Sequence, residues 1–168
     1  MKARFSQKWA KEKYATIIKE AINFVKGTRN CPDLLVKVFF YTEKGNCWKG
    51  NYRNVSIHGS YGCADLEMPN IITLKCSNRI FIDPSVLTEE EKGKLDLKKA
   101  SFNRYYKTLS MESMKKQFVE LFAHEFKHYL DMRSLMDKRK YRHWEVRADK
   151  FAKKMVEKYE KEKVVAHA

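Results

Sequence analysis

The chain has 168 residues, of which 43% are hydrophobic and 13% aromatic, and this composition argues against disorder and for one domain with a single core. Lysine and arginine exceed aspartate and glutamate by a formal net charge of +14, which suits nucleic acid or an acidic protein as a partner, or equally a solvated lysine-rich surface. The sequence contains no apolar run of signal-peptide or membrane-spanning length, so we expect a cytoplasmic protein without a membrane partner.

The four cysteines do not have the spacing of a thiolate zinc site. No C-x-x-C pair occurs among Cys31, Cys47, Cys63 and Cys76. Disulfides are also disfavoured in a reducing cytosol, so we expect these cysteines to be free thiols.

The N-terminal third predicts a helix followed by two strands. Residues 7–25 place apolar side chains at helical spacing, with Ser6 as the expected N-cap and Gly27 as the expected C-cap. Residues 34–42 are rich in β-branched and aromatic side chains, which predicts a buried strand, and a second strand is expected within residues 47–57.

The middle of the chain predicts a further strand, a short helix and a loop. Residues 71–76 read as a strand after the breaker Pro69, and residues 80–82 form a short apolar piece. A short helix is expected to open at Thr88. Residues 98–109 mix polar and aromatic side chains without clear periodicity and are expected to form a long loop.

A helix from Ser110 to about Met136 carries the motif with the clearest chemistry. His124, Glu125 and His128 form an H-E-x-x-H pattern, in which residues four apart share one helical face, so that both imidazoles reach one cation. Glu125 lies one step around the helix, where it can touch a water on that cation without being a ligand. This arrangement is typical of a zinc protease, with two histidine ligands and a glutamate as general base.

A last helix, expected over residues 143–161, offers the rest of a metal site. Glu145 and Asp149 share a helical face, so the first predicts a third metal ligand and the second a hydrogen-bond acceptor for a ligand histidine. Ala148 and Ala152 are small and would let this helix approach the histidine helix closely.

The two motifs together resemble those of a known family. The patterns H-E-x-x-H at 124–128 and E-x-x-A-D-x-F-A at 145–152 are similar to those of the gluzincin metallopeptidases, in particular the minigluzincin and ImmA/IrrE-like domains. The metzincin pattern is absent, because that family has a glycine at the position of Asp131 and a ligand at the position of Ser134. The resemblance covers the two motifs firmly and the rest of the chain from residue 34 loosely.

The resemblance implies a role for each residue of the site. By that likeness His124, His128 and Glu145 would be the protein ligands of one zinc ion per chain. Glu125 would be the catalytic base, and Asp149 would be a supporting carboxylate. The alternative third ligand is His143, because its sequence distance from the H-E-x-x-H motif is close to that of the third histidine ligand in SprT-like proteases. We favour Glu145, since it matches the gluzincin pattern together with its neighbours.

We therefore expect an α+β, zincin-like single domain over residues 1–168, with an N-terminal helix, a small twisted and largely antiparallel sheet, and two helices that carry the metal site. The strand at 71–76 is the expected sheet edge, to which a substrate backbone adds, with an interior strand as the equal alternative. The loop at 98–109 is expected to lie near the cleft.

The expected reaction is hydrolysis of peptide bonds in a protein or peptide substrate by zinc-activated water, with Glu125 as general base. The developing oxyanion needs a donor besides zinc. The candidates close in sequence to the site are Tyr141, His143 and Arg147.

Three alternative functions fit the same residues. A DNA-associated, SprT-like protease would act on DNA-bound proteins, and the basic residues within 138–142 would give it salt-dependent DNA binding. A non-catalytic module that binds nucleic acid or a partner would hold zinc without hydrolysing peptides. A structural zinc site is disfavoured, because three ligands beside Glu125 describe an open site, whereas structural sites are closed.

Overall fold

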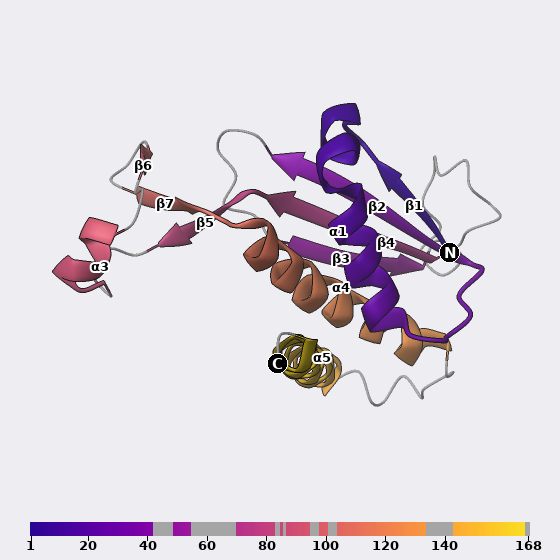
Figure 1. Ribbon diagram of the computed structural model, residues 1–168. Helices are drawn as coiled ribbons and strands as arrows, with labels where there is room; N and C mark the ends of the chain where they lie inside the picture. The colour runs from indigo at the N-terminus through magenta and orange to yellow at the C-terminus, as the bar shows by residue number, and fades with distance from the viewer. Residues whose placement is uncertain are drawn as a thin grey trace.

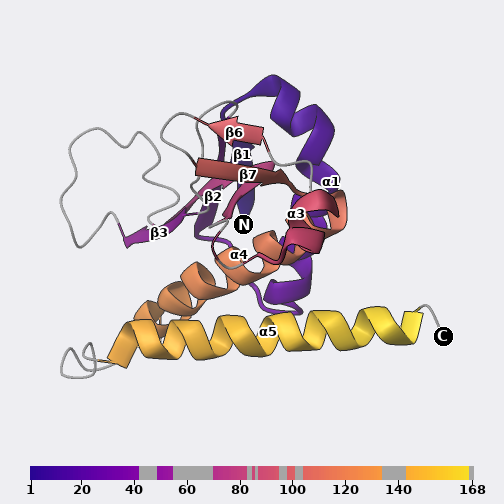
Figure 2. The same ribbon diagram turned by 90° about the vertical axis from the view of Figure 1, so that its left-hand side faces the viewer.

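The computed structural model describes residues 1–41, 49–54, 70–82, 85, 87–94, 98–100, 104–133 and 143–166. They form a mixed α/β structure built in layers. Two helices cover one face of a four-stranded sheet, and a further helix packs on the side of these helices that faces away from the sheet (Figures 1 and 2). None of the helices described is both long and apolar enough to cross a membrane.

The four-stranded sheet is mostly parallel, which corrects the antiparallel sheet predicted from the sequence. Its order is β1 (Lys2–Phe5), β2 (Leu34–Tyr41), β4 (Asn70–Ser77) and β3 (Lys49–Asn54). β1 and β4 both run parallel to β2, while β3 runs antiparallel to β4. A helix, α1 (Lys8–Lys26), connects β1 to β2 as a crossover, and the 4 residues of β1 are too few to predict a strand from the sequence.

The strand predicted at 71–76 exists as β4, but it is not the edge of the sheet. β4 lies between β2 and β3, and Asn70 pairs with Leu34 on one side and with Asn54 on the other. Most of its side chains are buried, as an interior strand requires, and Lys75 is the only exposed one among them. The outer strand on the side of the H-E-x-x-H helix is therefore β3.

Helix α1 (Lys8–Lys26) agrees with the predicted helix, but its N-terminal cap differs. Gln7 is the N-cap residue, and Ser6 donates its hydroxyl to a backbone carbonyl of β2 at 3.0 Å instead of capping the helix. The Gln7 side-chain amide donates to the carbonyl oxygen of Phe40 at 2.8 Å and accepts from its backbone nitrogen at 3.1 Å, which ties the start of α1 to β2. Gly27 ends the helix as predicted, with a φ of 57°.

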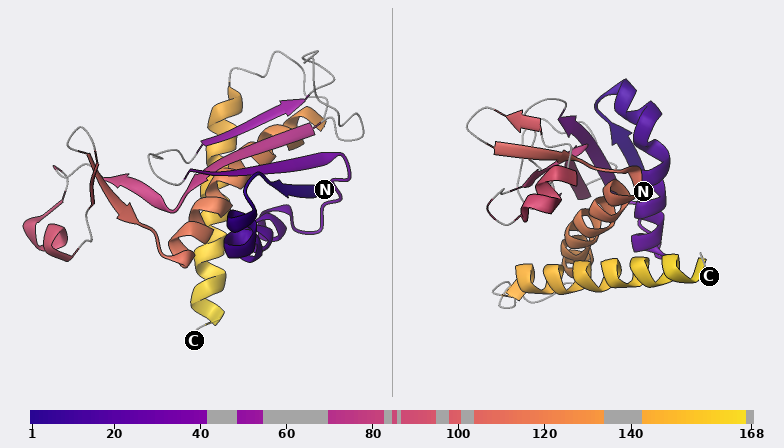
Figure 3. Two further views of the ribbon diagram at one scale, coloured as in Figure 1. Left: turned by 90° about the horizontal axis from the view of Figure 1, so that it is seen from above. Right: turned by 60° about the vertical axis from the view of Figure 1, so that its left-hand side comes forward.

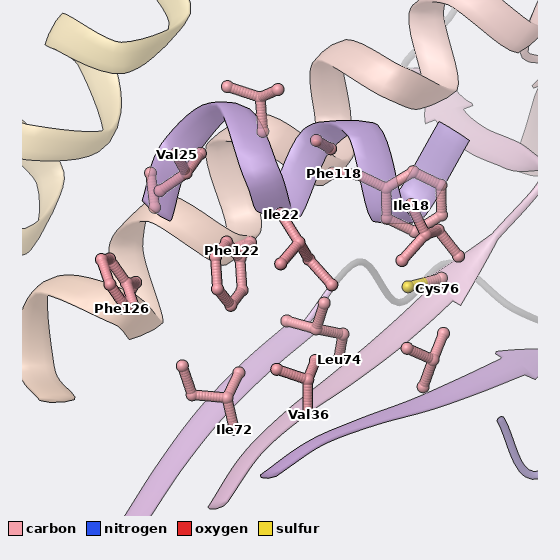
Figure 4. Close-up of a cluster of buried hydrophobic side chains, with 14 of the residues drawn as sticks. Ile18, Ile22, Val25, Val36, Ile72, Leu74, Cys76, Phe118, Phe122 and Phe126 are labelled. Atoms are coloured by element: carbon pink, nitrogen blue, oxygen red, sulfur yellow. The ribbon is translucent and has the colours of Figure 1, made fainter. Parts of the chain in front are cut away.

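Large aliphatic and aromatic side chains fill the layer between the sheet and the helices α1 and α4 (Met111–Arg133). Figure 4 shows part of this cluster, which includes Ile18, Ile22, Val25, Val36, Ile72, Leu74, Cys76, Phe118, Phe122 and Phe126. Because the three phenylalanines recur at every fourth residue of α4, they define its buried face. Residues halfway between them, such as His124, point away from the sheet, which leaves a second face of α4 for a functional site.

Residues 98–109, predicted to be a long loop near the cleft, contain two strands instead. β7 (Arg104–Thr108) pairs antiparallel with β6 (Lys98–Ala100) and with β5 (Arg79–Ile82). Together with the short helix α3 (Glu89–Lys94), they project beyond the N-terminal end of α4 (Figures 1 and 3). β5 is distant from β7 in the sequence, so local periodicity does not reveal this pairing.

The two helices that carry the predicted site are both present. α4 begins at the predicted cap, where the backbone nitrogen of Ser113 donates to the Ser110 hydroxyl at 3.1 Å. α5 (Trp144–Ala166) begins as predicted and continues beyond the expected end at residue 161. The connection between the two helices, residues 134–142, lies outside the described residues.

Helices α4 and α5 run in opposite directions and cross obliquely (Figure 2). Pairs of side chains link the two helices along their length, among them, in order along α4, Glu112 with Lys163, Lys116 with Glu160, and His124 with Asp149. Ala148 and Ala152 are buried in this contact, as their small size predicts. The first turns of α5 therefore lie beside the H-E-x-x-H part of α4.

A partly buried polar cluster fixes the C-terminal part of α4 to the sheet. Asp33, just before β2, accepts hydrogen bonds from the Tyr129 hydroxyl at 2.7 Å and from Asn70 Nδ2 at 2.7 Å. Arg133 donates to the Tyr129 hydroxyl at 3.0 Å. Burial, together with the hydrogen bond to Asp33, raises the pKa of Tyr129, so its hydroxyl stays neutral and donates.

Cys31 and Cys76 are buried free thiols, as the sequence analysis expects. Burial raises the pKa of the Cys76 thiol well above its ordinary value. Cys47 and Cys63 lie outside the described residues.

Candidate metal centre

The two histidines of the motif lie one above the other on the face of α4 that points away from the sheet. Their Nε2 atoms are 3.1 Å apart, and their rings meet edge to face with 4.8 Å between centroids. The phenylalanines on the opposite face of α4 fix this orientation, because any rotation of the helix would expose them. Both imidazoles therefore present the same type of nitrogen to one point.

Glu145, in the first turn of α5, brings a carboxylate to that point. Its Oε2 lies 3.2 Å from His124 Nε2, and its Oε1 lies 3.4 Å from His128 Nε2. The ligand atoms of these three residues all lie within 4.8 Å of one another. The third ligand expected from the sequence thus lies with the two histidines, whereas the alternative, His143, is exposed and is not part of this group.

The donor set suits a zinc ion by both chemistry and spacing. Two imidazole nitrogens and one carboxylate form the open type of zinc site, and ligand atoms about 2.1 Å from a tetrahedral zinc ion lie roughly 3.4 Å from one another. The Nε2 atoms of His124 and His128 lie 3.1 Å apart, and each lies 3.2 or 3.4 Å from a different carboxylate oxygen of Glu145, which is close to that value. Burial lowers the pKa of His128, which favours the neutral imidazole that binds a metal.

Asp149 fixes the orientation of the first histidine. Its Oδ1 lies 3.0 Å from His124 Nδ1, and the nearby carboxylate favours a proton on that ring nitrogen, which leaves Nε2 for the metal. His128 is held differently, because its ring packs edge to face on Trp144 with 4.8 Å between centroids. The Nδ1 of His128 is buried and has no hydrogen-bond partner among the residues that the structure describes.

Glu125 is nearly buried, with 6% of its surface exposed, and it packs against the backbone of the outer strand β3. A Cβ atom added at Gly50 would lie 2.2 Å from Glu125 Oε1 and 2.4 Å from its Cγ. The backbone of Gly50 has no positive φ, so the glycine is needed here for space rather than for an unusual conformation. This contact was not predicted from the sequence, although a glycine inside a strand is a known signal of close approach.

A second ion-pair group links the two helices beside the histidines. Asp131 is buried, and its Oδ1 accepts hydrogen bonds from Arg147 Nη2 at 2.8 Å and Lys127 Nζ at 2.5 Å. Arg147 was a candidate oxyanion donor, but its guanidinium is bound to Asp131 in this structure. Of the other candidates, His143 is exposed and Tyr141 lies outside the described residues.

A cavity of about 810 Å³ opens beside the histidines and extends between α4 and α5. His124, Glu125 and Asp149 line it at one end, and Gly50 contributes from β3. Its far end is lined by Lys116 and Glu160, among others. The candidate metal centre therefore borders a space large enough for a substrate segment.

No protein-family model, curated protein or solved structure matches the chain. A functional assignment therefore depends on the residues and geometry of the site itself.

Proposed function

We propose that this chain is a zinc-dependent metalloendopeptidase of the gluzincin type, with a zincin-like arrangement of the helices that carry its site. The observation that supports this proposal best is the convergence of imidazole nitrogens from His124 and His128 and a carboxylate from Glu145 within 4.8 Å. This group stands beside a nearly buried glutamate and a cavity, which is the combination that metal-assisted hydrolysis needs.

Glu125 supplies the acid–base chemistry of the chain. Its carboxylate lines the cavity directly after the first histidine, where it takes the proton from the attacking water and returns it to the leaving amine. Zinc held by the three ligands would polarise the scissile carbonyl and lower the pKa of its water towards neutrality. Contact with Gly50 restricts where the carboxylate can lie, so the base is oriented before a substrate enters.

Two features favour an open, gluzincin-type site over the alternatives. Glu145 rather than His143 faces both imidazoles, which favours the gluzincin pattern over the SprT-like one. Three ligands leave one tetrahedral position for water or substrate, and a structural zinc site would fill that position with a fourth side chain.

The experiment that tests this function is a paired assay of zinc content and peptide cleavage on Glu125→Gln. The substitution keeps the size of the side chain and removes the base. Zinc content and melting temperature should stay at wild-type values, while cleavage of a quenched fluorescent peptide library falls by about 10²–10⁴-fold.

Glu162→Gln is the matched control, because Glu162 lies on an exposed part of α5 and pairs only with Lys158 among the described residues, at 3.5 Å. It should cleave as fast as the wild type. Equal cleavage by Glu125→Gln and wild type would show that the hydrolytic mechanism is wrong.

A further inference from the structure

The cavity beside the candidate metal centre is rich in carboxylates, although the chain as a whole has a net charge of +14. Its carboxylates come from both helices: Glu120 and Glu125 from α4, and Asp149, Glu157 and Glu160 from α5. The lysines that line it are Lys116 and Lys153. The charge that a bound ligand meets in the cavity is thus opposite in sign to the average charge of the molecule.

Two of these carboxylates are not engaged by other parts of the chain. Asp149 is bound to His124, and Glu160 forms an ion pair with Lys116. In contrast, Glu120 and Glu157 are exposed and form no ion pair or hydrogen bond with any residue in the described part of the chain. They are therefore available to a cation that enters the cavity.

The cavity that these two carboxylates line also has apolar residues in its wall. Leu121 on α4 and Ala152 and Val156 on α5 line the same cavity. Lysine and arginine side chains combine an aliphatic stem with a positively charged head. A cavity with an aliphatic floor and unpaired carboxylates beside it complements such a side chain in both shape and charge.

The carboxylates also lie at a useful distance from the reacting centre. Glu120 is one helical turn from His124, about 6 Å along α4, and Glu157 is about 12 Å from Asp149 along α5. Extended chain rises about 3.3 Å per residue, so these distances correspond to roughly two to four residues of a bound peptide.

We propose that Glu120 and Glu157 determine specificity, and that the substrate is a protein segment with a lysine or arginine within about four residues of the scissile bond. This inference rests on the proposed peptidase function. The basic surface elsewhere does not oppose it, because salt at physiological concentration screens charges more than about 8 Å away, whereas the two carboxylates contact the ligand directly.

A binding experiment separates this proposal from the proposed hydrolysis. The zinc-loaded Glu125→Gln protein is titrated with fluorescent randomised decapeptide pools in which one position is fixed as lysine, acetyl-lysine or glutamate. Acetylation keeps the stem and removes the charge. The lysine pool should bind about three- to tenfold more tightly than the acetyl-lysine pool, because two exposed ion pairs contribute at this level. The glutamate pool should bind most weakly.

Glu120→Gln combined with Glu157→Gln should abolish the difference between the pools. Glu12→Gln combined with Glu162→Gln is the matched control, since both glutamates form exposed ion pairs outside the cavity, and it should keep the preference. Equal binding of all pools, tighter binding of the glutamate pool, no binding of any pool, or a preference that survives the Glu120 and Glu157 changes would each overturn the proposal.

Cleavage by the wild type reports independently on the proposed function. If wild-type protein cleaves peptides without regard to their charge, the peptidase assignment stands and the specificity proposal is wrong. If the lysine pool binds selectively but no peptide is cleaved, the cavity has the proposed specificity and the hydrolytic function is wrong.

Discussion

Helix α4 takes part in two polar groups that differ in how their hydrogen-bonding capacity is used. In the cluster at its C-terminal part, both oxygens of Asp33 accept hydrogen bonds at 2.7 Å, from the hydroxyl of Tyr129 and the amide of Asn70. At the candidate metal centre, the side chain of Glu145 is 76% exposed and faces two imidazole nitrogens at 3.2 and 3.4 Å. The first group is complete within the protein, whereas the second brings together two ring nitrogens and a carboxylate, which are the atoms that bind a metal ion.

This difference indicates different roles for the two groups. Buried polar atoms that are satisfied by one another add to stability and specify one packing arrangement. Two imidazole nitrogens and an exposed carboxylate that converge on one point form the ligand set of an open zinc site, so their arrangement favours a binding site over a stabilising contact. Changes in the Asp33 cluster should therefore affect unfolding, and changes near the histidines should affect zinc and turnover.

Among changes outside the ligands and the proposed base, the largest effect is expected at Gly50, where an added methyl group would displace the carboxylate of Glu125. Gly50→Ala places a Cβ 2.2 Å from Glu125 Oε1, and the carboxylate must move because the strand backbone is held by β4. We expect peptide cleavage to fall by about 100-fold, as a displacement of about 1 Å can produce. Zinc content should be unchanged, because Gly50 is not part of the ligand group.

Peptide cleavage and zinc content measured on the same preparation check this prediction. A Gly50→Ala protein that cleaves at the wild-type rate would show that the contact with Glu125 does not position the base. Loss of zinc together with activity would instead show that β3 supports the metal site as a whole.

A smaller effect is expected at Asp149, which holds His124 without being a ligand. Asp149→Asn keeps the shape of the side chain but removes the charge that fixes the Nδ1 proton of His124. Zinc affinity, measured by competition with a chromophoric chelator, should fall by about 10–100-fold. Lys150→Gln on the exposed side of the same helix turn serves as the control and should not change the affinity.

The smallest effect on zinc is expected in the Asp33 cluster. Tyr129→Phe removes the hydroxyl that donates to Asp33 and accepts from Arg133, which should lower the free energy of unfolding by about 1–3 kcal/mol. Chemical denaturation at a fixed zinc concentration measures this loss. If zinc affinity fell as far as in the Asp149 variant, the two polar groups would not be independent, and the comparison between them would fail.

The grouping of the site residues could be predicted from the sequence because it depends mainly on helical spacing. His124 and His128 are four residues apart on α4, and Glu145 and Asp149 are four apart on α5, so each pair shares a face whatever the rest of the fold does. Buried Ala148 provides the close approach of α5 that brings the pairs together.

The sheet could not be predicted as well, because its order depends on pairing between distant segments. The strand Lys2–Phe5 has only 4 residues, too few for their alternation to predict a strand, yet it pairs in parallel with β2 and changes the topology. The same limit hides the strands β6 and β7, and it hides the contact of Gly50 with Glu125, which depends on β3 lying next to α4.

The zinc content of purified protein tests the central claim most directly. Wild-type protein, Glu145→Ala and His143→Ala are dialysed against metal-free buffer and their zinc is measured by elemental analysis. We predict one zinc per chain for the wild type and for His143→Ala, and loss of most zinc from Glu145→Ala, because its carboxylate faces both imidazoles. Full zinc content in Glu145→Ala, or a greater loss in His143→Ala, would contradict the assignment of the third ligand.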